Sequence, residues 1–163
     1  MLKAIILFLN LFFFSLIGLA QEKERFMDFS FITSQHSIIE NKEKQSLYNI
    51  ETDYTLLYFY NPECENCDKI KKKLIKNKSL NKLIKENKIT LLAVVPDVEK
   101  EYWLDNLGCV PNNWINAWNK NDEKIISTYL HTVPTFFILD REKNIIQRPN
   151  EREVLKWIKT IGK

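Results

Sequence analysis

The hydrophobic pattern of the chain contains three continuous apolar runs of strand length. They are rich in β-branched and aromatic residues and cover residues 54–60, 89–95 and 135–139. Each run is followed by turn-forming residues, with proline near the end of the first two. Runs of this kind are typical of strands covered on both faces, so we expect three central strands.

Apolar residues at helical spacing follow these runs. A stripe begins at Cys64 and comprises Cys67, Ile70, Leu74 and Ile75, and a second is formed by Leu80, Leu83 and Ile84. We also expect helices over residues 99–107 and 113–119. After a turn at 141–144 and a short strand at 144–147, an amphipathic helix follows Asn150 with Val154, Leu155, Ile158 and Ile161 facing inward.

Residues 21–50 carry a weaker pattern. Phe29 and Phe31 alternate with polar residues and Ile38-Ile39 follow, which predicts short strands around a turn at Asn41-Lys42. No repeat or linker divides residues 21–163, so we expect one domain there. The order of elements predicts an α/β three-layer sandwich, with a central mixed β-sheet flanked by helices.

The first 20 residues have the pattern of a secretory signal peptide. Lys3 precedes an apolar run from Ala4 to Leu19, and the run closes on Gly18-Leu19-Ala20 before charged residues. The alternative is an uncleaved membrane anchor, but a helix over residues 4–20 would reach only roughly 25 Å, against ~30 Å of hydrocarbon. We therefore expect an exported, periplasmic protein, membrane-anchored only if this segment is retained.

Composition narrows the chemistry. The 163 residues are 45% hydrophobic with a net charge of +3, which excludes a disordered chain and does not indicate a nucleic-acid partner. The lysines between residues 69 and 88 surround the apolar stripes, so we interpret them as a solvated helix face. The three glycines form no phosphate-binding loop, and the three cysteines do not make a fully paired disulfide scaffold. Cysteine chemistry is the remaining candidate.

Cys64-Glu65-Asn66-Cys67 lies where a buried strand passes into a helix. At a helix N-terminus the unpaired N–H groups and the helix dipole favour the thiolate of Cys64, the form that attacks disulfides. Cys67 lies one turn later and can close an intramolecular disulfide.

This arrangement resembles the thioredoxin superfamily. Residues 55–67 match its strand, C-x-x-C and helix, and Thr132-Val133-Pro134-Thr135 matches its cis-proline loop. Ser46-Leu47 and a Trp-rich segment from Trp103 to Trp118 resemble the exported TlpA/ResA-like branch. Over roughly residues 26–161, the resemblance implies a thioredoxin-like fold, with Cys64 as the attacking thiol and Cys67 as the resolving thiol. It also implies that Val133 and cis-Pro134 shape the substrate groove, and that no cofactor is needed.

The chain departs from thioredoxin at three places. Glu63 replaces a tryptophan, Tyr58 replaces a buried aspartate, and the residues between the cysteines are Glu65 and Asn66. The group that moves a proton to or from Cys67 is therefore unassigned. Negative charge at Glu63 and Glu65 opposes the thiolate and so favours a reductant over a strong oxidant.

Other readings of these residues remain open. Pro134 alone would suit a trans proline at the start of a strand. We interpret Cys109 as a small buried hydrophobic residue and, secondarily, as a regulatory thiol. Cys64, Cys67, Cys109 and His131 formally supply a zinc set, but we favour an exposed loop for His131, as for His36.

The main hypothesis is an exported thiol–disulfide oxidoreductase acting on protein thiols and disulfides and recycled by a redox partner. The alternatives are a copper- or zinc-binding protein on the same fold, which would use Cys64 and Cys67 with or without His131, and a module in which this pair is a permanent disulfide.

Overall fold

The computed structural model describes residues 23–33, 45–119 and 122–162. The predicted signal peptide, residues 1–20, lies outside the described residues, as do His36, Ile38-Ile39 and the Asn41-Lys42 turn. None of the helices in the described part of the chain is long and apolar enough to cross a membrane.

The strands of the described residues form one mixed sheet in the order β2-β1-β5-β4-β3-β6-β7. The strands are β1 (Ser30–Thr33), β2 (Gln45–Ser46), β3 (Tyr54–Phe59), β4 (Ile89–Val95), β5 (Ile115–Trp118), β6 (Thr135–Asp140) and β7 (Ile145–Gln147). The central strands β3, β4 and β5 are parallel, whereas β6 runs antiparallel to β3 and β1 antiparallel to β5. The three predicted strands are thus adjacent to one another, in the order β4-β3-β6.

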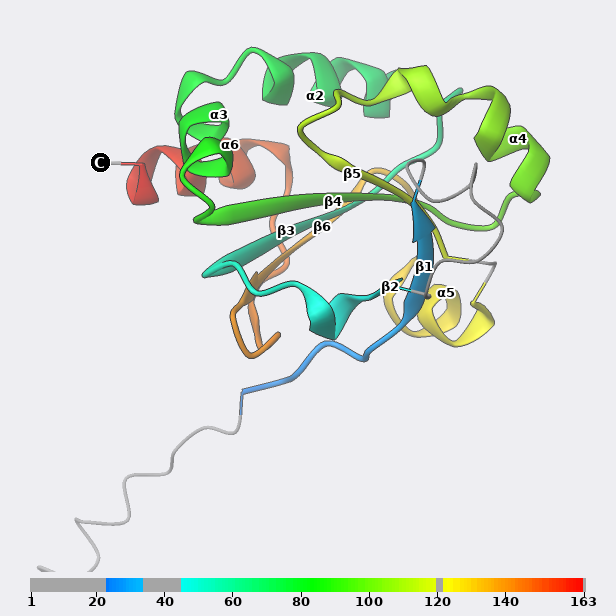
Figure 1. The fold of residues 1–163 in the computed structure, drawn as a ribbon, viewed down its shortest axis with the longest axis horizontal. Coiled ribbons are helices and arrows are strands. Elements are labelled where there is room, and N and C mark those ends of the chain that lie inside the picture. The colour runs from blue at the N-terminus through cyan, green and yellow to red at the C-terminus, as the bar shows by residue number, and fades with distance from the viewer. Residues whose placement is uncertain (1–22, 34–44, 120–121, 163) are drawn as a thin grey trace, which may run out of the picture.

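Helices cover both faces of this sheet. The helices are α2 (Glu65–Ile75), α3 (Lys78–Lys85), α4 (Lys100–Asp105), α5 (Glu123–Tyr129) and α6 (Glu151–Ile161), with short 3₁₀ helices η1 (Leu47–Asn49) and η2 (Leu107–Cys109). Figure 1 shows α2, α3, α4 and α6 on one side of the sheet, and α5 and η1 on the other. The α/β three-layer sandwich is confirmed.

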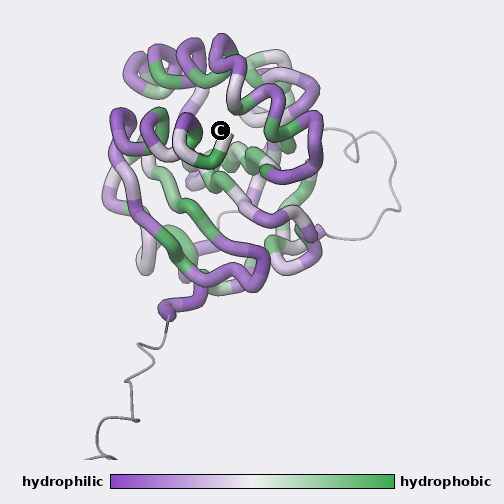
Figure 2. The backbone as a smooth tube through the Cα atoms, turned by 90° about the vertical axis from the view of Figure 1, so that its left-hand side faces the viewer, coloured by the Kyte–Doolittle hydropathy of each residue, from purple (hydrophilic) through white to green (hydrophobic). Residues whose placement is uncertain are grey.

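The core consists of two apolar clusters, one on each face of the sheet. Along β3, Leu56 and Tyr58 belong to the cluster under α2 and α6, and Leu57 and Phe59 belong to the cluster that includes α5. All four side chains are fully buried. Each such side chain contributes about 1.5–3 kcal/mol by leaving water. In Figure 2 hydrophobic segments lie in the interior of the molecule, and hydrophilic and hydrophobic residues alternate along the helices.

The helix expected after Asn150 is confirmed, and its start is well capped. The Asn150 side chain accepts from the Glu153 N–H, and the Glu153 carboxylate accepts from the Asn150 N–H. This capping box satisfies two backbone donors that the first turn leaves unpaired. Val154 and Ile158 face the core, as their spacing predicts.

Three details of the sequence prediction are corrected. Residues 113–119 are not helical, because Ile115–Trp118 forms β5, in register with β4 on one side and β1 on the other. Ile75 is 38% exposed, since it lies about 100° around the helix from buried Leu74. Helix α5, Glu123–Tyr129, was not predicted; it begins where the Asp122 side chain accepts from the Lys124 and Ile125 N–H groups.

The turn between β6 and β7 holds the N-terminal segment in place. The Phe26 N–H donates to the Lys143 carbonyl (2.8 Å), and the Ile145 N–H donates to the Glu24 carbonyl (2.7 Å). Lys143 is buried at a φ of 68°, and its ammonium group donates to the carbonyls of Ile50 and Arg141. Burial lowers the pKa of this ammonium.

Candidate active site

The loop between β3 and α2 places Cys64 at the start of a helix. Asn61 folds this loop: its side-chain oxygen accepts from the Glu63 N–H (2.8 Å) and its carbonyl accepts from the Cys64 N–H (3.1 Å). Pro62 restricts the backbone between them. Helix α2 then begins at Glu65, with Cys64 as its N-cap residue.

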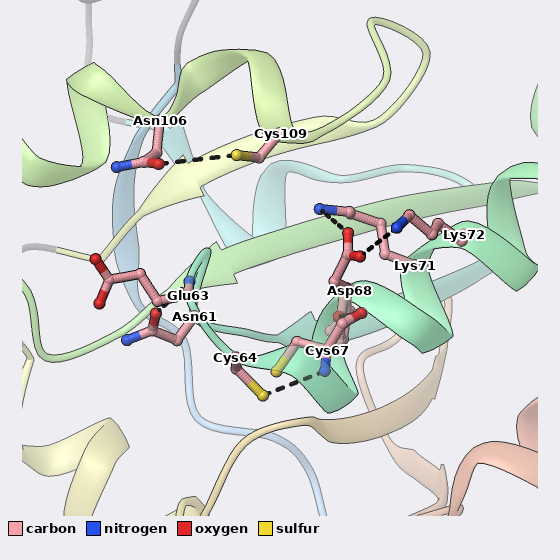
Figure 3. Close-up of polar contacts among 10 residues, drawn as sticks. Asn61, Glu63, Cys64, Cys67, Asp68, Lys71, Lys72, Asn106 and Cys109 are labelled. Atoms are coloured by element: carbon pink, nitrogen blue, oxygen red, sulfur yellow. Dashed lines mark hydrogen bonds and ion pairs between the residues drawn. The ribbon is translucent and has the colours of Figure 1, made fainter.

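The Cys64 sulfur faces both the helix and the loop before β6. Its Sγ accepts from the Cys67 N–H at 3.2 Å (Figure 3). The same sulfur lies 3.9 Å from the Val133 carbonyl oxygen, toward which the thiol points. An N–H aimed at the sulfur and the positive end of the α2 dipole both stabilise negative charge on it. Cys64 is partly exposed, so another molecule can reach it.

Cys67 lies behind Cys64 and is only 1% exposed. Burial raises the pKa of its thiol to about 12, and the neighbouring Cys64 adds to the rise, whereas the Asn61 backbone and the Tyr58 hydroxyl act to lower it. Both cysteines are free thiols in this structure. One exposed sulfur and one buried sulfur a single turn apart are suited to attack and resolution, respectively.

Tyr58 occupies the position beneath Cys67. Its side chain is fully buried, and its hydroxyl donates to the Cys67 carbonyl at 2.9 Å. The ring is stacked between Tyr60 (centroids 5.3 Å apart) and Phe136 (4.7 Å). Burial is the main cause that raises the pKa of this phenol, so it stays protonated at neutral pH. The sequence marked the position as a departure from thioredoxin, but it did not indicate these contacts.

Val133 and Pro134 lie beside the pair. The Val133–Pro134 peptide bond is cis. A groove of about 230 Å³ adjoins Cys64 here, since Asn61 and Val133, which both hydrogen-bond Cys64, form part of its wall. The remaining lining residues are Pro96, Asp97, Ile126, Leu130, His131 and Thr132.

The nearby carboxylates are engaged at the surface. The Glu63 side chain points away from both sulfurs (Figure 3). The pKa of the Tyr102 hydroxyl is raised first by burial and then by the charge of Glu63. Glu65 pairs with Lys69 at 2.7 Å. Asp68 pairs with Lys71 and Lys72, and these contacts lower the pKa of its carboxyl.

The four residues considered for zinc are not gathered into a ligand set. No group of three or more His, Cys, Asp and Glu side chains among the described residues is arranged to hold a metal ion. Cys109 lies apart from the pair, with its Sγ 3.9 Å from Asn106 Oδ1 (Figure 3). It packs against the core but is partly exposed, which corrects the expectation of a buried residue. His131 is exposed beside the groove, as favoured.

A buried polar network lies at the end of the sheet from which the cysteine loop begins. Asn116 on β5 accepts from the Tyr60 hydroxyl and from Trp103 Nε1, both at 3.1 Å, and donates to the Leu107 carbonyl at 3.3 Å. Asn116 was not singled out from the sequence, because the segment was interpreted as a helix. A buried asparagine among apolar neighbours was the available signal. The other tryptophans of this segment are core residues or partly buried: Trp114 is 5% exposed, and Trp118 donates to the Val98 carbonyl.

Comparisons with known proteins agree with this geometry. Residues 52–145 match a family model described as thioredoxin-like. A search of curated proteins finds no match. Among solved structures, a thioredoxin-like protein from Bacteroides caccae superposes with a TM-score of 0.73 at 24% identity. The alignment covers 86% of this chain but only 50% of that protein, so this chain spans about half its length.

Two further structures match over nearly their whole length. A conserved protein of unknown function from Bacteroides fragilis has a TM-score of 0.73 and 25% identity, over 83% of this chain and 96% of that one. The thioredoxin domain of a thiol-disulfide oxidoreductase from Bacteroides vulgatus has a TM-score of 0.63 and 19% identity, over 83% and 96% of the two chains.

Proposed function

Because the chain belongs to the thioredoxin-like family, we propose that it is an exported thiol–disulfide oxidoreductase that reduces or exchanges disulfides of other exported proteins. The observation that carries the proposal is the pair itself. Cys64 is partly exposed at the start of α2 with an N–H on its sulfur, and Cys67 is buried one turn behind it.

The reaction proceeds through two thiol–disulfide exchanges. The Cys64 thiolate attacks one sulfur of a partner disulfide, so that a mixed disulfide forms and the other partner sulfur leaves as a thiolate. The Cys67 thiol loses its proton to water, and its thiolate attacks Cys64 Sγ. The Cys64–Cys67 bond then forms while the bond to the partner breaks, and the second partner sulfur leaves as a thiolate. Both partner thiolates take up protons from water, so that the partner is released as a dithiol. A separate redox partner returns the Cys64–Cys67 disulfide to two thiols.

The groove beside Cys64 supports a role for the Val133–Pro134 segment in holding the partner chain. The Val133 carbonyl lies within 3.9 Å of the attacking sulfur, and apolar Ile126 and Leu130 line the same groove. An extended segment that carries a disulfide fits a site of this composition, in which apolar surface gives affinity and backbone groups fix orientation.

Export and the TlpA/ResA-like assignment rest on the sequence. The apolar run that ends at Gly18-Leu19-Ala20 supports export, where a disulfide partner can persist. Ser46-Leu47 and the tryptophan-rich segment support the branch. The proposal places the substrates among exported proteins.

The test is the behaviour of single cysteine variants toward insulin, a disulfide-containing protein substrate. Cys67→Ser should form a stable mixed disulfide with insulin on a non-reducing gel, because the resolving thiol is missing. Cys64→Ser should form none and should lose reductase activity. Cys109→Ser is the matched control and should behave as the parent chain. Equal insulin reduction by all four proteins would contradict the proposal.

A further inference from the structure

We propose that Tyr58 is the positioning residue for Cys67: its hydroxyl holds the first turn of α2 and donates to the Cys67 thiolate when that thiolate forms. The proposal rests on the proposed function, because it assigns the stabilising partner of the resolving step. It assigns a hydrogen-bond donor to the Cys67 thiolate and not a group that moves the proton, which passes to and from water.

Three observations carry the inference. The Tyr58 hydroxyl donates to the Cys67 carbonyl at 2.9 Å, and after burial the Cys67 thiol is the next cause that raises the pKa of this phenol. The ring is fully buried between Tyr60 and Phe136, so the oxygen is held at this position. The carboxylates nearest in sequence, Glu63, Glu65 and Asp68, make their contacts at the surface with Tyr102 and lysines.

A phenol hydroxyl can serve both protonation states of Cys67. It has one donor and two acceptor positions, and the proton rotates about the C–O bond. While Cys67 is a thiol, the Tyr58 hydroxyl donates its hydrogen bond to the Cys67 carbonyl, and the Tyr58 oxygen can accept a hydrogen bond from the Cys67 S–H group. When Cys67 becomes a thiolate, the same hydroxyl can turn and donate to the sulfur. No proton passes to the phenol itself, because a phenol buried here remains protonated at neutral pH.

The role applies in both directions of exchange. In resolution the Cys67 thiol gives its proton to water and the Tyr58 hydroxyl stabilises the attacking thiolate. In reduction of the Cys64–Cys67 disulfide, the incoming thiolate bonds to Cys64, and Cys67 leaves as a thiolate that receives the same hydrogen bond before water protonates it. The titratable groups facing Cys67 are Cys64 on its own helix and Tyr58 and Tyr60 on the sheet side.

The experiment follows the two stages of a model exchange. One equivalent of 5,5′-dithiobis(2-nitrobenzoate) is mixed with the reduced protein in a Cys109→Ser background, and the coloured thiolate is recorded by stopped flow. The first release reports attack by Cys64, and the second reports resolution by Cys67. Tyr58→Phe keeps the ring and removes the hydroxyl. The matched control is Tyr60→Phe, whose hydroxyl bonds Asn116 instead.

Tyr58→Phe should leave the first release within twofold of the parent and slow the second roughly tenfold, the loss expected for one hydrogen bond to a charged sulfur. Its second release should stay about tenfold slower than the parent's at every pH from roughly 6 to 9, as a rise of about one unit in the Cys67 pKa predicts, while its first release keeps the parent's pH dependence. Tyr60→Phe should show neither change. Equal second-stage rates in the two variants overturn the Tyr58 assignment and leave the proposed function intact.

A second variant tests the same hydrogen bond without removing any group from the buried Tyr58 side chain. Replacing Tyr58 by 3-fluorotyrosine keeps the hydroxyl and makes it a stronger donor, so the second release should become two- to threefold faster. An unchanged or slower release overturns the assignment. If the Cys109→Ser parent gives no second release at all, both the proposed function and the role of Tyr58 fall.

Discussion

Replacing Asn116 by alanine tests the buried network at the active-site end of the sheet. The change removes the acceptor shared by the Tyr60 hydroxyl and Trp103 Nε1, and both donors are buried. Each buried donor left without a partner costs about 1–3 kcal/mol. Two such donors predict a loss of about 2–6 kcal/mol in the free energy of unfolding, with the lower half favoured because water can enter the space left by the amide.

The assay is urea denaturation of the reduced protein, followed by tryptophan fluorescence. Asn112→Ala is the matched control: the same change at an exposed site should stay within about 0.5 kcal/mol of the parent. Tyr60→Phe should cost only about 1 kcal/mol, because the Asn116 oxygen keeps its bond from Trp103. In the Asn116→Ala background the same change removes an unpaired hydroxyl and should be neutral or stabilising.

Two results would refute this reasoning. A loss below about 1 kcal/mol in Asn116→Ala would mean that the two donors find other partners at little cost. An undiminished effect of Tyr60→Phe in the Asn116→Ala background would mean that the two side chains are not coupled. A result within the predicted range would also explain why a polar side chain lies between β5 and helix α4: it ties Trp103 to the strand that leads into the cysteine loop.

Two further predictions concern the cysteine pair. Because burial holds the pKa of Cys67 at about 12, the rate of resolution should rise by about tenfold per pH unit between roughly pH 6 and 9. This rate is measured as the second release in the stopped-flow assay, and a plateau near neutral pH would contradict the prediction. Glutathione titration should place the reduction potential of the Cys64–Cys67 pair below about −200 mV. Removing both charges in Glu63→Gln/Glu65→Gln should raise this potential by about 10–30 mV, a modest effect because both side chains are exposed. A potential near −120 mV, or an unchanged potential in the variant, would count against the charge argument.

The main fold could be predicted because its central strands are buried on both faces. Continuous apolar runs such as 54–60 and 89–95 leave few alternatives. The segment Ile115–Trp118 could not be assigned in this way, because only four residues form the strand and its partners, β1 and β4, are distant in sequence. Pairing with distant strands, rather than local preference, determines its conformation.

The same distinction between local sequence and distant contacts applies to the residues of the candidate site. Cys64 and Cys67 are adjacent in sequence and one turn apart, so local pattern was sufficient to find them. The contacts of Tyr58 with Cys67 depend on how β3 lies under α2, and those of Asn116 depend on three separate elements. Lys143 is a similar case: its ammonium is buried because it lies against the carbonyls of Ile50, which precedes β3, and Arg141, which follows β6, and no local pattern shows this.

The contacts of Glu24 and Phe26 with the β6–β7 turn have a further consequence for orientation. They join the N-terminal segment to the end of the sheet where β3 starts, since Tyr54 pairs with Asp140 there. The cysteine pair follows the other end of β3, five residues and roughly 17 Å away. Figure 1 shows the N-terminal segment entering the fold on the side away from the start of α2. Any attachment ahead of Lys23 would therefore hold the molecule at the end of the sheet opposite the cysteine pair. The two thiols would then face away from the attachment, toward approaching partners.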